Sequence, residues 1–204
     1  FVYPAEVDVL IRAGWFYHED QDESVKSLEK LVDIYFNSVG RNAVLLLNIP
    51  PDKRGLINEK DAERLKEFKA WIDQTFDENL LFRAFTRYPT ARKSVDGKDD
   101  TYAIIDQFPA GVEYKIPFAK EFNVFMIQED ISKGQRIEDF KLEAYINDEW
   151  QELASSTTAG YKKLLRFPVV KSDRIRLSIN SSRANALIQE IGLFRTPDIN
   201  NEPE

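Results

Sequence analysis

The stretch Ala43-Val44-Leu45-Leu46-Leu47-Asn48-Ile49-Pro50-Pro51 decides the fold of this chain. Its first five residues are apolar without interruption, a single polar residue follows, and two prolines close the stretch after one more apolar residue. A run this short and this uniformly apolar predicts a strand that is buried on both faces. The prolines end the strand, because neither can donate a backbone hydrogen bond.

Amphipathic helices are predicted on both sides of this strand. Before it, Ser24 is the expected N-cap of a helix and Gly40 the expected left-handed residue after its end. The apolar side of that helix consists of residues at helical spacing: Leu28, Leu31, Val32, Tyr35, Phe36 and Val39. After the strand, Asn58 caps a second helix that ends near Phe76. This order predicts an α/β fold with a parallel sheet, in which ligands sit at the carboxyl ends of strands, where Asn48 lies.

Another strand is predicted over residues 2–9, and it carries two carboxylates on one face. Glu6 and Asp8 share that face because strand side chains alternate. The pattern leaves two interpretations open, a solvated strand face or a pocket within a sheet that helices cover.

An aromatic loop, Gly14-Trp15-Phe16-Tyr17-His18, follows this strand. One interpretation is a hydrophobic plug that only packs. The other is a platform for sugar, because a flat aromatic ring stacks on the apolar face of a pyranose. For His18 alone, a hydrogen-bonded structural role is the simpler interpretation.

From about Leu80 the pattern changes to short alternating runs, at residues 112–116, 124–128, 140–146, 164–167, 174–179 and 186–194. Turn residues such as Asp96-Gly97 and Asn147-Asp148 separate them. Several short strands with frequent turns predict an all-β sandwich. We therefore expect an α/β segment over residues 1–78, a β-sandwich over 79–197 and a frayed tail over 198–204.

Composition excludes several classes of function. The chain has 204 residues, 43% of them hydrophobic, and a formal net charge of −7. A nucleic-acid partner is not expected, because it would require a basic face. A membrane span is not expected either, because no apolar run approaches the roughly 20 residues needed. With no cysteine and one histidine, neither a disulfide nor a multi-histidine metal site can form within the chain.

The amino-terminal segment is expected to be incomplete on its own. The sequence starts at Phe1 with neither an initiator Met nor a signal peptide. Two parallel strands leave faces and edges open, exposing apolar rows and unpaired backbone groups. We therefore expect the first 76 residues to complete a sheet whose other strands come from further chain.

Several collinear segments of the chain resemble α-L-fucosidases of glycoside hydrolase family 29. The resemblance in the first part rests on residues 4–9, 11–12, 14–18, 31–35, 38–42, 45–52, 54–57 and 64–68. In the second part, residues 129–131, 134–137, 160–162 and 165–168 resemble the discoidin-type sandwich that follows the barrel in this family. The subfamily that acts on branched α-1,3/1,4-linked fucose is the most similar.

The resemblance implies the last two β/α units of a (β/α)8 barrel, followed by a discoidin-like (galactose-binding-like) antiparallel β-sandwich. The strand ending near Glu6 would be the seventh and the Leu45 strand the eighth. Such enzymes are retaining hydrolases, in which an Asp nucleophile and a Glu acid/base lie roughly 5 Å apart. Both carboxylates are expected upstream of Phe1, so no catalytic residue is assigned here, although a shifted alignment that makes Glu6 the acid/base stays open.

The resemblance also assigns a substrate-binding role to residues of this chain. Trp15 matches the aromatic that packs on the fucose ring, Glu6 would hold a substrate hydroxyl or a pocket residue, and Asn48 lies at a strand end beside them. No cofactor or metal is expected. Ala103 stands where a tryptophan is common, so the sandwich is expected to be a scaffold.

The expected partners are a fucosylated glycan and the missing N-terminal barrel portion, and the chain alone is expected to be inactive. By analogy with such hydrolases, we expect a periplasmic or extracellular location. The alternative function is a non-catalytic carbohydrate-binding or structural module.

Overall fold

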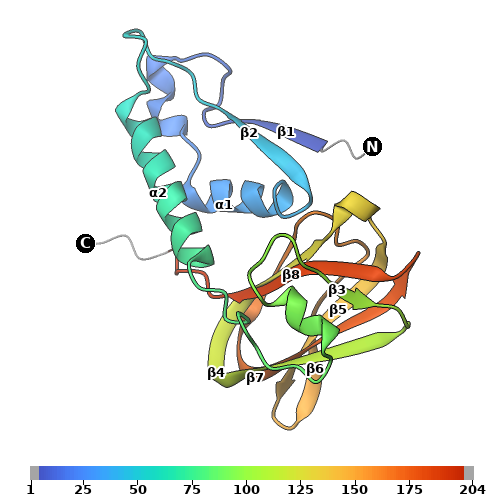
Figure 1. Cartoon of the computed structure of the whole chain (residues 1–204). Helices are drawn as coiled ribbons and strands as arrows, with labels where there is room; N and C mark the ends of the chain where they lie inside the picture. The colour runs from blue at the N-terminus through green and yellow to red at the C-terminus, as the bar shows by residue number, and fades with distance from the viewer. Residues whose placement is uncertain (1–4, 200–204) are drawn as a thin grey trace. The chain divides into compact units, whose positions relative to one another are not determined.

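A computed structural model describes residues 5–199 of the chain (Figure 1). The chain forms two compact units that divide between Asp77 and Glu78. The amino-terminal unit extends to Asp77, and the carboxyl-terminal unit spans Glu78–Thr196. The predicted strand at residues 2–9 begins outside the described residues, and so does most of the predicted tail. Among the described residues, no helix has both the length and the apolar composition that crossing a membrane requires.

The amino-terminal unit alternates strands and helices. Its elements in chain order are β1 (Ala5–Leu10), the short 3-10 helix η1 (Glu19–Ser24), α1 (Leu28–Asn37), β2 (Ala43–Asn48) and α2 (Glu59–Phe76). β1 and β2 pair in parallel, with a register that runs from Ala5 opposite Ala43 to Leu10 opposite Asn48. The predicted parallel pairing of a strand–helix–strand–helix segment is confirmed.

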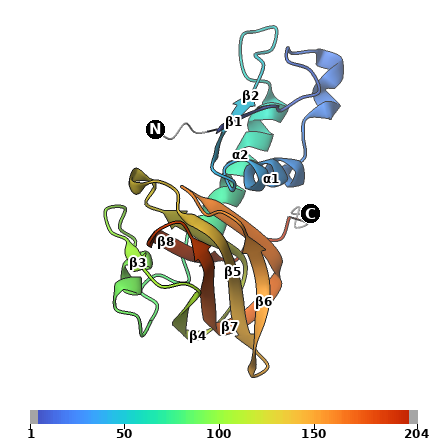
Figure 2. The same cartoon turned by 90° about the vertical axis from the view of Figure 1, so that its right-hand side faces the viewer.

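Only one face of the β1–β2 sheet is partly buried, because both helices lie on the same side of it (Figures 1 and 2). Residues opposite one another across a parallel pair point to the same face. The partly buried side chains are Val7, Val9, Leu45 and Leu47. The exposed side chains are Glu6, Asp8, Val44 and Leu46. The prediction that this strand is buried on both faces is therefore wrong for the described residues, in which Val44 is 50% and Leu46 49% exposed.

The ends of α1 differ from the prediction. Ser27 is the N-cap, and its Oγ accepts a hydrogen bond from the Lys30 N–H at 3.2 Å. Ser24 instead closes η1 and donates to the Gln21 carbonyl at 2.6 Å. Gly40 does not adopt the left-handed conformation; Asn42 does so, with φ of 68°. The helix thus starts later than predicted, because η1 takes up the acidic run before it.

The second helix was predicted correctly. Asn58 is its N-cap, with Oδ1 accepting from the Lys60 N–H at 3.0 Å, and it ends at Phe76. Trp71 is buried and meets Phe36 of α1 edge-to-face at 6.2 Å between ring centroids. This aromatic contact joins the two helices.

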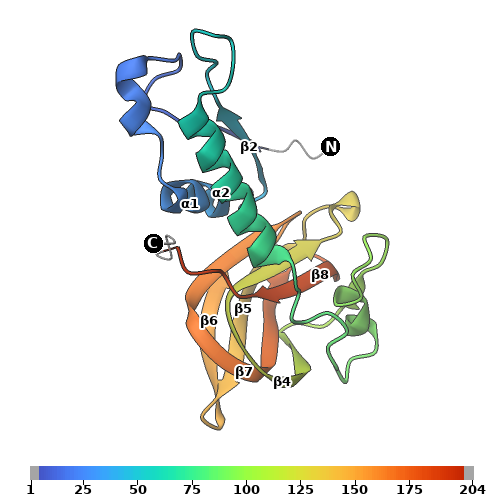
Figure 3. The ribbon, with the colours of Figure 1, turned by 90° about the vertical axis from the view of Figure 1, so that its left-hand side faces the viewer.

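The carboxyl-terminal unit is an antiparallel sheet with the strand order β3-β8-β4-β7-β5-β6. Figure 3 shows β4, β5, β6, β7 and β8 of this sheet. Its strands are β3 (Ala103–Ile105), β4 (Ala110–Glu129), β5 (Ile137–Ile146), β6 (Glu149–Ser156), β7 (Lys163–Ser182) and β8 (Ala186–Phe194). The short 3-10 helix η2 (Thr90–Ser94) precedes β3, and η3 (Ile131–Lys133) lies between β4 and β5. The sheet surrounds one apolar core, in which the largest buried side chains include Phe122, Phe125 and Phe140. This arrangement fits the predicted β-sandwich.

Four of the predicted short strands are halves of two long ones. Residues 112–116 and 124–128 both belong to β4, and residues 164–167 and 174–179 both belong to β7. Both long strands continue through a proline, Pro117 in β4 and Pro168 in β7. The β4–β7 pairing changes register between Lys115 and Lys120, which is how a strand accommodates an irregular residue and bends.

Candidate functional site

Asn48 and Trp15 meet at the carboxyl end of the parallel strands. Asn48 is the last residue of β2 and pairs with Leu10, the last residue of β1. Its Nδ2 donates to the Trp15 carbonyl at 3.0 Å, and its own carbonyl accepts from the Ile11 N–H at 3.0 Å. The two predicted site residues are thus joined directly, through the backbone of the aromatic loop.

A cavity of about 370 Å³ lies at this strand end, lined by residues 15–17, Asn48 and residues 50–53. The side chains of Trp15 and Phe16 are 50% and 72% exposed. An open cavity with large exposed aromatic side chains and a few polar groups is what sugar recognition requires. We call it the strand-end cavity.

Arg12 anchors the aromatic loop to neighbouring elements of the amino-terminal unit. Its side chain is fully buried, with Nε 3.0 and 2.9 Å from the two Asp61 carboxylate oxygens and Nη1 2.7 Å from Asp22. Its guanidinium carbon lies 4.8 Å from the Tyr17 ring centre. Burial lowers the pKa of Arg12, but its hydrogen bonds to Asp61 and Asp22 outweigh this and raise the pKa above its usual value. The loop is therefore tied to α2 through Asp61 and to η1 through Asp22.

These anchoring residues were not predicted from the sequence. Asp61 lies in the first turn of α2, where the helix dipole favours a carboxylate whatever its partner. The available signal was a single Arg placed directly after an apolar strand, and nothing in the spacing identified its partners 10 and 49 residues away.

The proline side of the cavity ends in a turn at residues 52–55. The Asp52 Oδ1 accepts from the Arg54 N–H at 2.8 Å, and Gly55 adopts φ of 77°. Hydrogen bonding to the Arg54 side chain lowers the pKa of Asp52 below its usual value. Lys53, which lines the cavity, forms an exposed ion pair with Glu19 of η1 at 2.8 Å. Asp52 is thus a carboxylate whose charge is compensated by the adjacent Arg54.

Glu6 does not lie with Asn48 and Trp15. β1 begins at Ala5, so Glu6 stands near its start, opposite Val44. It lies four residues before Leu10, or about 13 Å at the usual rise of a strand. The prediction that Glu6 stands at the carboxyl end of its strand is therefore wrong. Its side chain is exposed on the same face as Asp8.

The remaining candidate groups of this unit were His18 and the acidic side chains. His18 is exposed and precedes η1 without capping it through its side chain. In residues 5–199, no three His, Asp or Glu side chains gather as metal ligands would.

Solved structures of glycoside hydrolase family 29 proteins are similar to this chain over nearly its whole length. The solved structure of SpGH29 matches with a TM-score of 0.91 at 42% identity, over 96% of this chain and 44% of that one. A Ruminococcus gnavus GH29 fucosidase in complex with fucose matches with a TM-score of 0.86 at 30% identity, over 96% of this chain and 42% of that one.

The family model that matches part of the chain is that of the α-L-fucosidases, and the match covers residues 4–76. α-L-Fucosidase 1 of Arabidopsis thaliana is 40% identical over 94% of this chain and 40% of its own length. The resemblance predicted from the sequence is confirmed. The chain spans about two fifths of the length of the curated relatives it matches.

Proposed function

We propose that this chain is part of a retaining α-L-fucosidase that removes terminal α-linked L-fucose from glycans. The observation that carries the proposal is the strand-end cavity, in which the exposed Trp15 is fixed by Asn48 within the segment that matches the α-L-fucosidase family model. In this proposal the ring of Trp15 packs on the sugar, and Asn48 orients the loop that carries it.

The exposed face of the β1–β2 sheet supports the proposal that these strands are the seventh and eighth of a (β/α)8 barrel. The interior of such a barrel is filled by the side chains of its strands. Val44 and Leu46 are half-exposed, which is unfavourable for aliphatic side chains but would be relieved by strands from a further portion of protein. Within residues 5–199 no other strand pairs with β1 or β2. The partner would therefore be the N-terminal barrel portion.

Hydrolysis with retention needs two carboxylates roughly 5 Å apart. We assign the Asp nucleophile and the Glu acid/base to the barrel portion outside this chain. Glu6 would face the barrel interior, about 13 Å below the strand end, where supporting a pocket residue fits better than touching fucose. The carboxyl-terminal unit would be a discoidin-like scaffold, and export to the periplasm or the cell exterior would fit an enzyme acting on glycans.

Hydrolysis of an aryl α-L-fucoside tests the proposal. In the complete enzyme, Trp15→Ala should raise KM at least about tenfold, the loss expected on removing a stacking aromatic, while Trp15→Phe should retain most of the affinity. Phe118→Ala, which removes a 76% exposed aromatic from the carboxyl-terminal unit, is the matched control. An unchanged KM for Trp15→Ala would make that residue part of the packing only.

The 204-residue chain alone should not hydrolyse the same substrate. Turnover by the pure chain, abolished by Glu6→Gln, would instead make Glu6 the acid/base. If the complete protein binds fucose without hydrolysing it, the chain belongs to a carbohydrate-binding module.

A further inference from the structure

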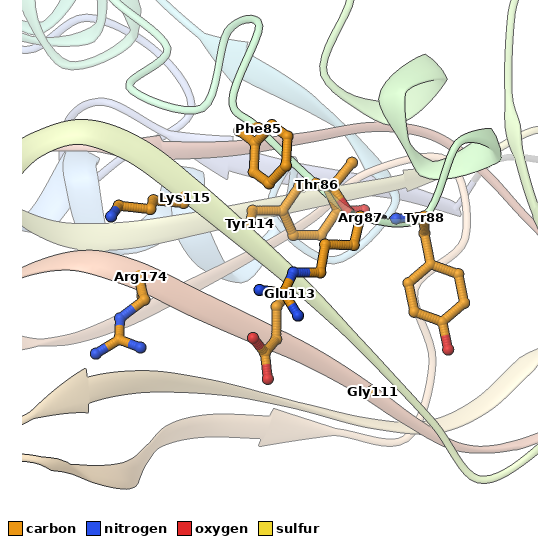
Figure 4. A pocket seen from close by; sticks show the side chains of 9 residues that line it. All are labelled: Phe85, Thr86, Arg87, Tyr88, Gly111, Glu113, Tyr114, Lys115 and Arg174. Atoms are coloured by element: carbon orange, nitrogen blue, oxygen red, sulfur yellow. Dashed lines mark hydrogen bonds between the residues drawn. The ribbon is translucent and has the colours of Figure 1, made fainter.

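A second cavity, of about 440 Å³, lies within the carboxyl-terminal unit (Figure 4). The groups that matter for its chemistry are Phe85, Arg87, Tyr88, Glu113, Lys115 and Arg174. Phe85, Arg87 and Tyr88 come from the segment before η2, whereas the other three come from β4 and β7. We call it the sandwich cavity. Its volume is in the range of small-molecule sites.

The aromatic wall of the sandwich cavity is fixed by its backbone. The Phe85 N–H donates to the Lys115 carbonyl at 2.9 Å, and the Lys115 N–H donates back at 2.8 Å. The Tyr88 N–H donates to Thr86 Oγ1 at 3.2 Å, and the Tyr88 carbonyl accepts from Ala91 at 3.1 Å. The rings of Phe85 and Tyr88 are nonetheless 58% and 50% exposed. The backbone that carries these two half-exposed rings is therefore held in place.

The remaining walls carry more positive than negative charge. Arg87, Lys115 and Arg174 contribute three cations against the single carboxylate of Glu113. Within the part of the chain that the structure describes, Arg87 has no hydrogen-bond or ion-pair partner. Lys115 and Arg174 each approach Asp173 at 3.8 Å, and the Arg174 guanidinium carbon also lies 3.6 Å from the centre of the Tyr145 ring. This excess of cations occurs in a chain whose net charge is −7.

The neighbouring arginine provides a contrast. Arg176 donates to both oxygens of Glu143 at 2.8 Å, and these hydrogen bonds lower the pKa of Glu143 to about 2. Arg176 lines an adjacent cavity of about 310 Å³, which shares Gly111 with the sandwich cavity. Its charge is therefore already neutralised, whereas that of Arg87 is available to a ligand.

We propose that the sandwich cavity binds an acidic sugar residue, one that carries a carboxylate or a sulfate group. The rings of Tyr88 and Phe85 would pack against the C–H groups of the pyranose. The guanidinium of Arg87 would donate two parallel hydrogen bonds to the anionic substituent, with Lys115 and Arg174 adding charge. The site is separate from the strand-end cavity and does not depend on the proposed hydrolysis.

Binding to the full chain tests this by NMR titration with galactose 6-sulfate, galacturonic acid, galactose and inorganic sulfate. Both acidic sugars should shift the amide signals of residues 85–88 and 113–115. Galactose and sulfate should each bind at least about fivefold more weakly, because each supplies only one half of the recognition. Arg87→Gln and Tyr88→Ala should each weaken binding of the acidic sugars by at least about fivefold.

Two matched variants serve as controls. Arg92→Gln removes an exposed arginine, and Tyr161→Ala an exposed aromatic, neither of which lines the cavity. Both should bind the acidic sugars unchanged. The proposal is overturned if galactose binds as tightly as galactose 6-sulfate, if sulfate alone does so, if the shifts map elsewhere, or if neither acidic sugar binds.

Discussion

Asp61→Asn removes the charge that compensates Arg12 beneath the aromatic loop. Arg12 and Asp61 are both fully buried, and the two carboxylate oxygens lie 3.0 and 2.9 Å from Arg12 Nε. The substitution keeps the shape of the side chain but leaves the guanidinium with Asp22 as its remaining anion. Arg12 Nη2 is already buried without a partner among the described residues, so no spare contact replaces the loss.

The expected cost is large relative to the stability of a domain. Breaking a buried ion pair by removing one partner typically costs 3–5 kcal/mol, since an uncompensated charge is left behind. Because Asp22 remains and its side chain is 26% exposed, we expect a value of about 3 kcal/mol. A domain has on the order of 5–15 kcal/mol in total, so the amino-terminal unit should open well before the carboxyl-terminal unit.

Amide hydrogen exchange with increasing urea measures the two units separately. The free energy of opening should fall by about 3 kcal/mol for amides of β1 and α2 and stay unchanged for those of β4 and β7. Glu19→Gln is the control, because its ion pair with Lys53 is 73–78% exposed and should contribute little to stability. The double variant Arg12→Met/Asp61→Leu should be more stable than Asp61→Asn, since no charge stays buried.

The reasoning fails if the free energy of opening measured for Asp61→Asn lies within about 0.5 kcal/mol of that measured for the Glu19→Gln control. It fails equally if the double variant is the less stable of the two, because shape rather than charge would then be what the site requires.

Three other substitutions test the packing and the electrostatics. Burial raises the pKa of Glu190 from 4.5 to about 7, so the folded chain binds the Glu190 proton more tightly than the unfolded chain does. The stability of the folded chain should therefore fall as pH rises through about 7, and Glu190→Gln should flatten the pH profile of Tm. Asn58→Ala removes the N-cap of α2 and should cost about 1 kcal/mol in urea denaturation. Gly192→Ala would place a Cβ 2.6 Å from two ring carbons of Phe194 and should lower stability by about 1–3 kcal/mol, whereas an unchanged urea midpoint would contradict the packing of β8.

Local chemistry made part of the fold predictable from sequence. Asn58 defines its helix start through its own side chain, and the turn Asn147-Asp148 adopts positive φ of 51° and 64°, as a tight hairpin requires. The prediction that Ser24 is the N-cap of the first helix was wrong because Ser27, three residues later, is an equally good capping residue. Only the structure shows that an acidic 3-10 helix intervenes.

The features that depend on distant chain could not be predicted. The apolar run at residues 43–47 indicated burial on both faces, but burial depends on what covers a strand and not only on its composition. The link between Trp15 and Asn48 was implied only by their positions near strand ends, and the hydrogen bond between them required coordinates. The Arg12 anchor was missed altogether, because its partners follow from the path of the loop and of α2.

The long pairing of β4 with β7 has a consequence for how the chain folds. Ala110 pairs with Ile179 and Ile127 with Lys163, while β3 pairs with β8 near the end of the unit. Each of these contacts closes a long loop, whose entropy is lost before the paired strands gain stability. The carboxyl-terminal unit should therefore fold on the millisecond-to-second timescale typical of non-local β topologies, well after α1 and α2 can form locally.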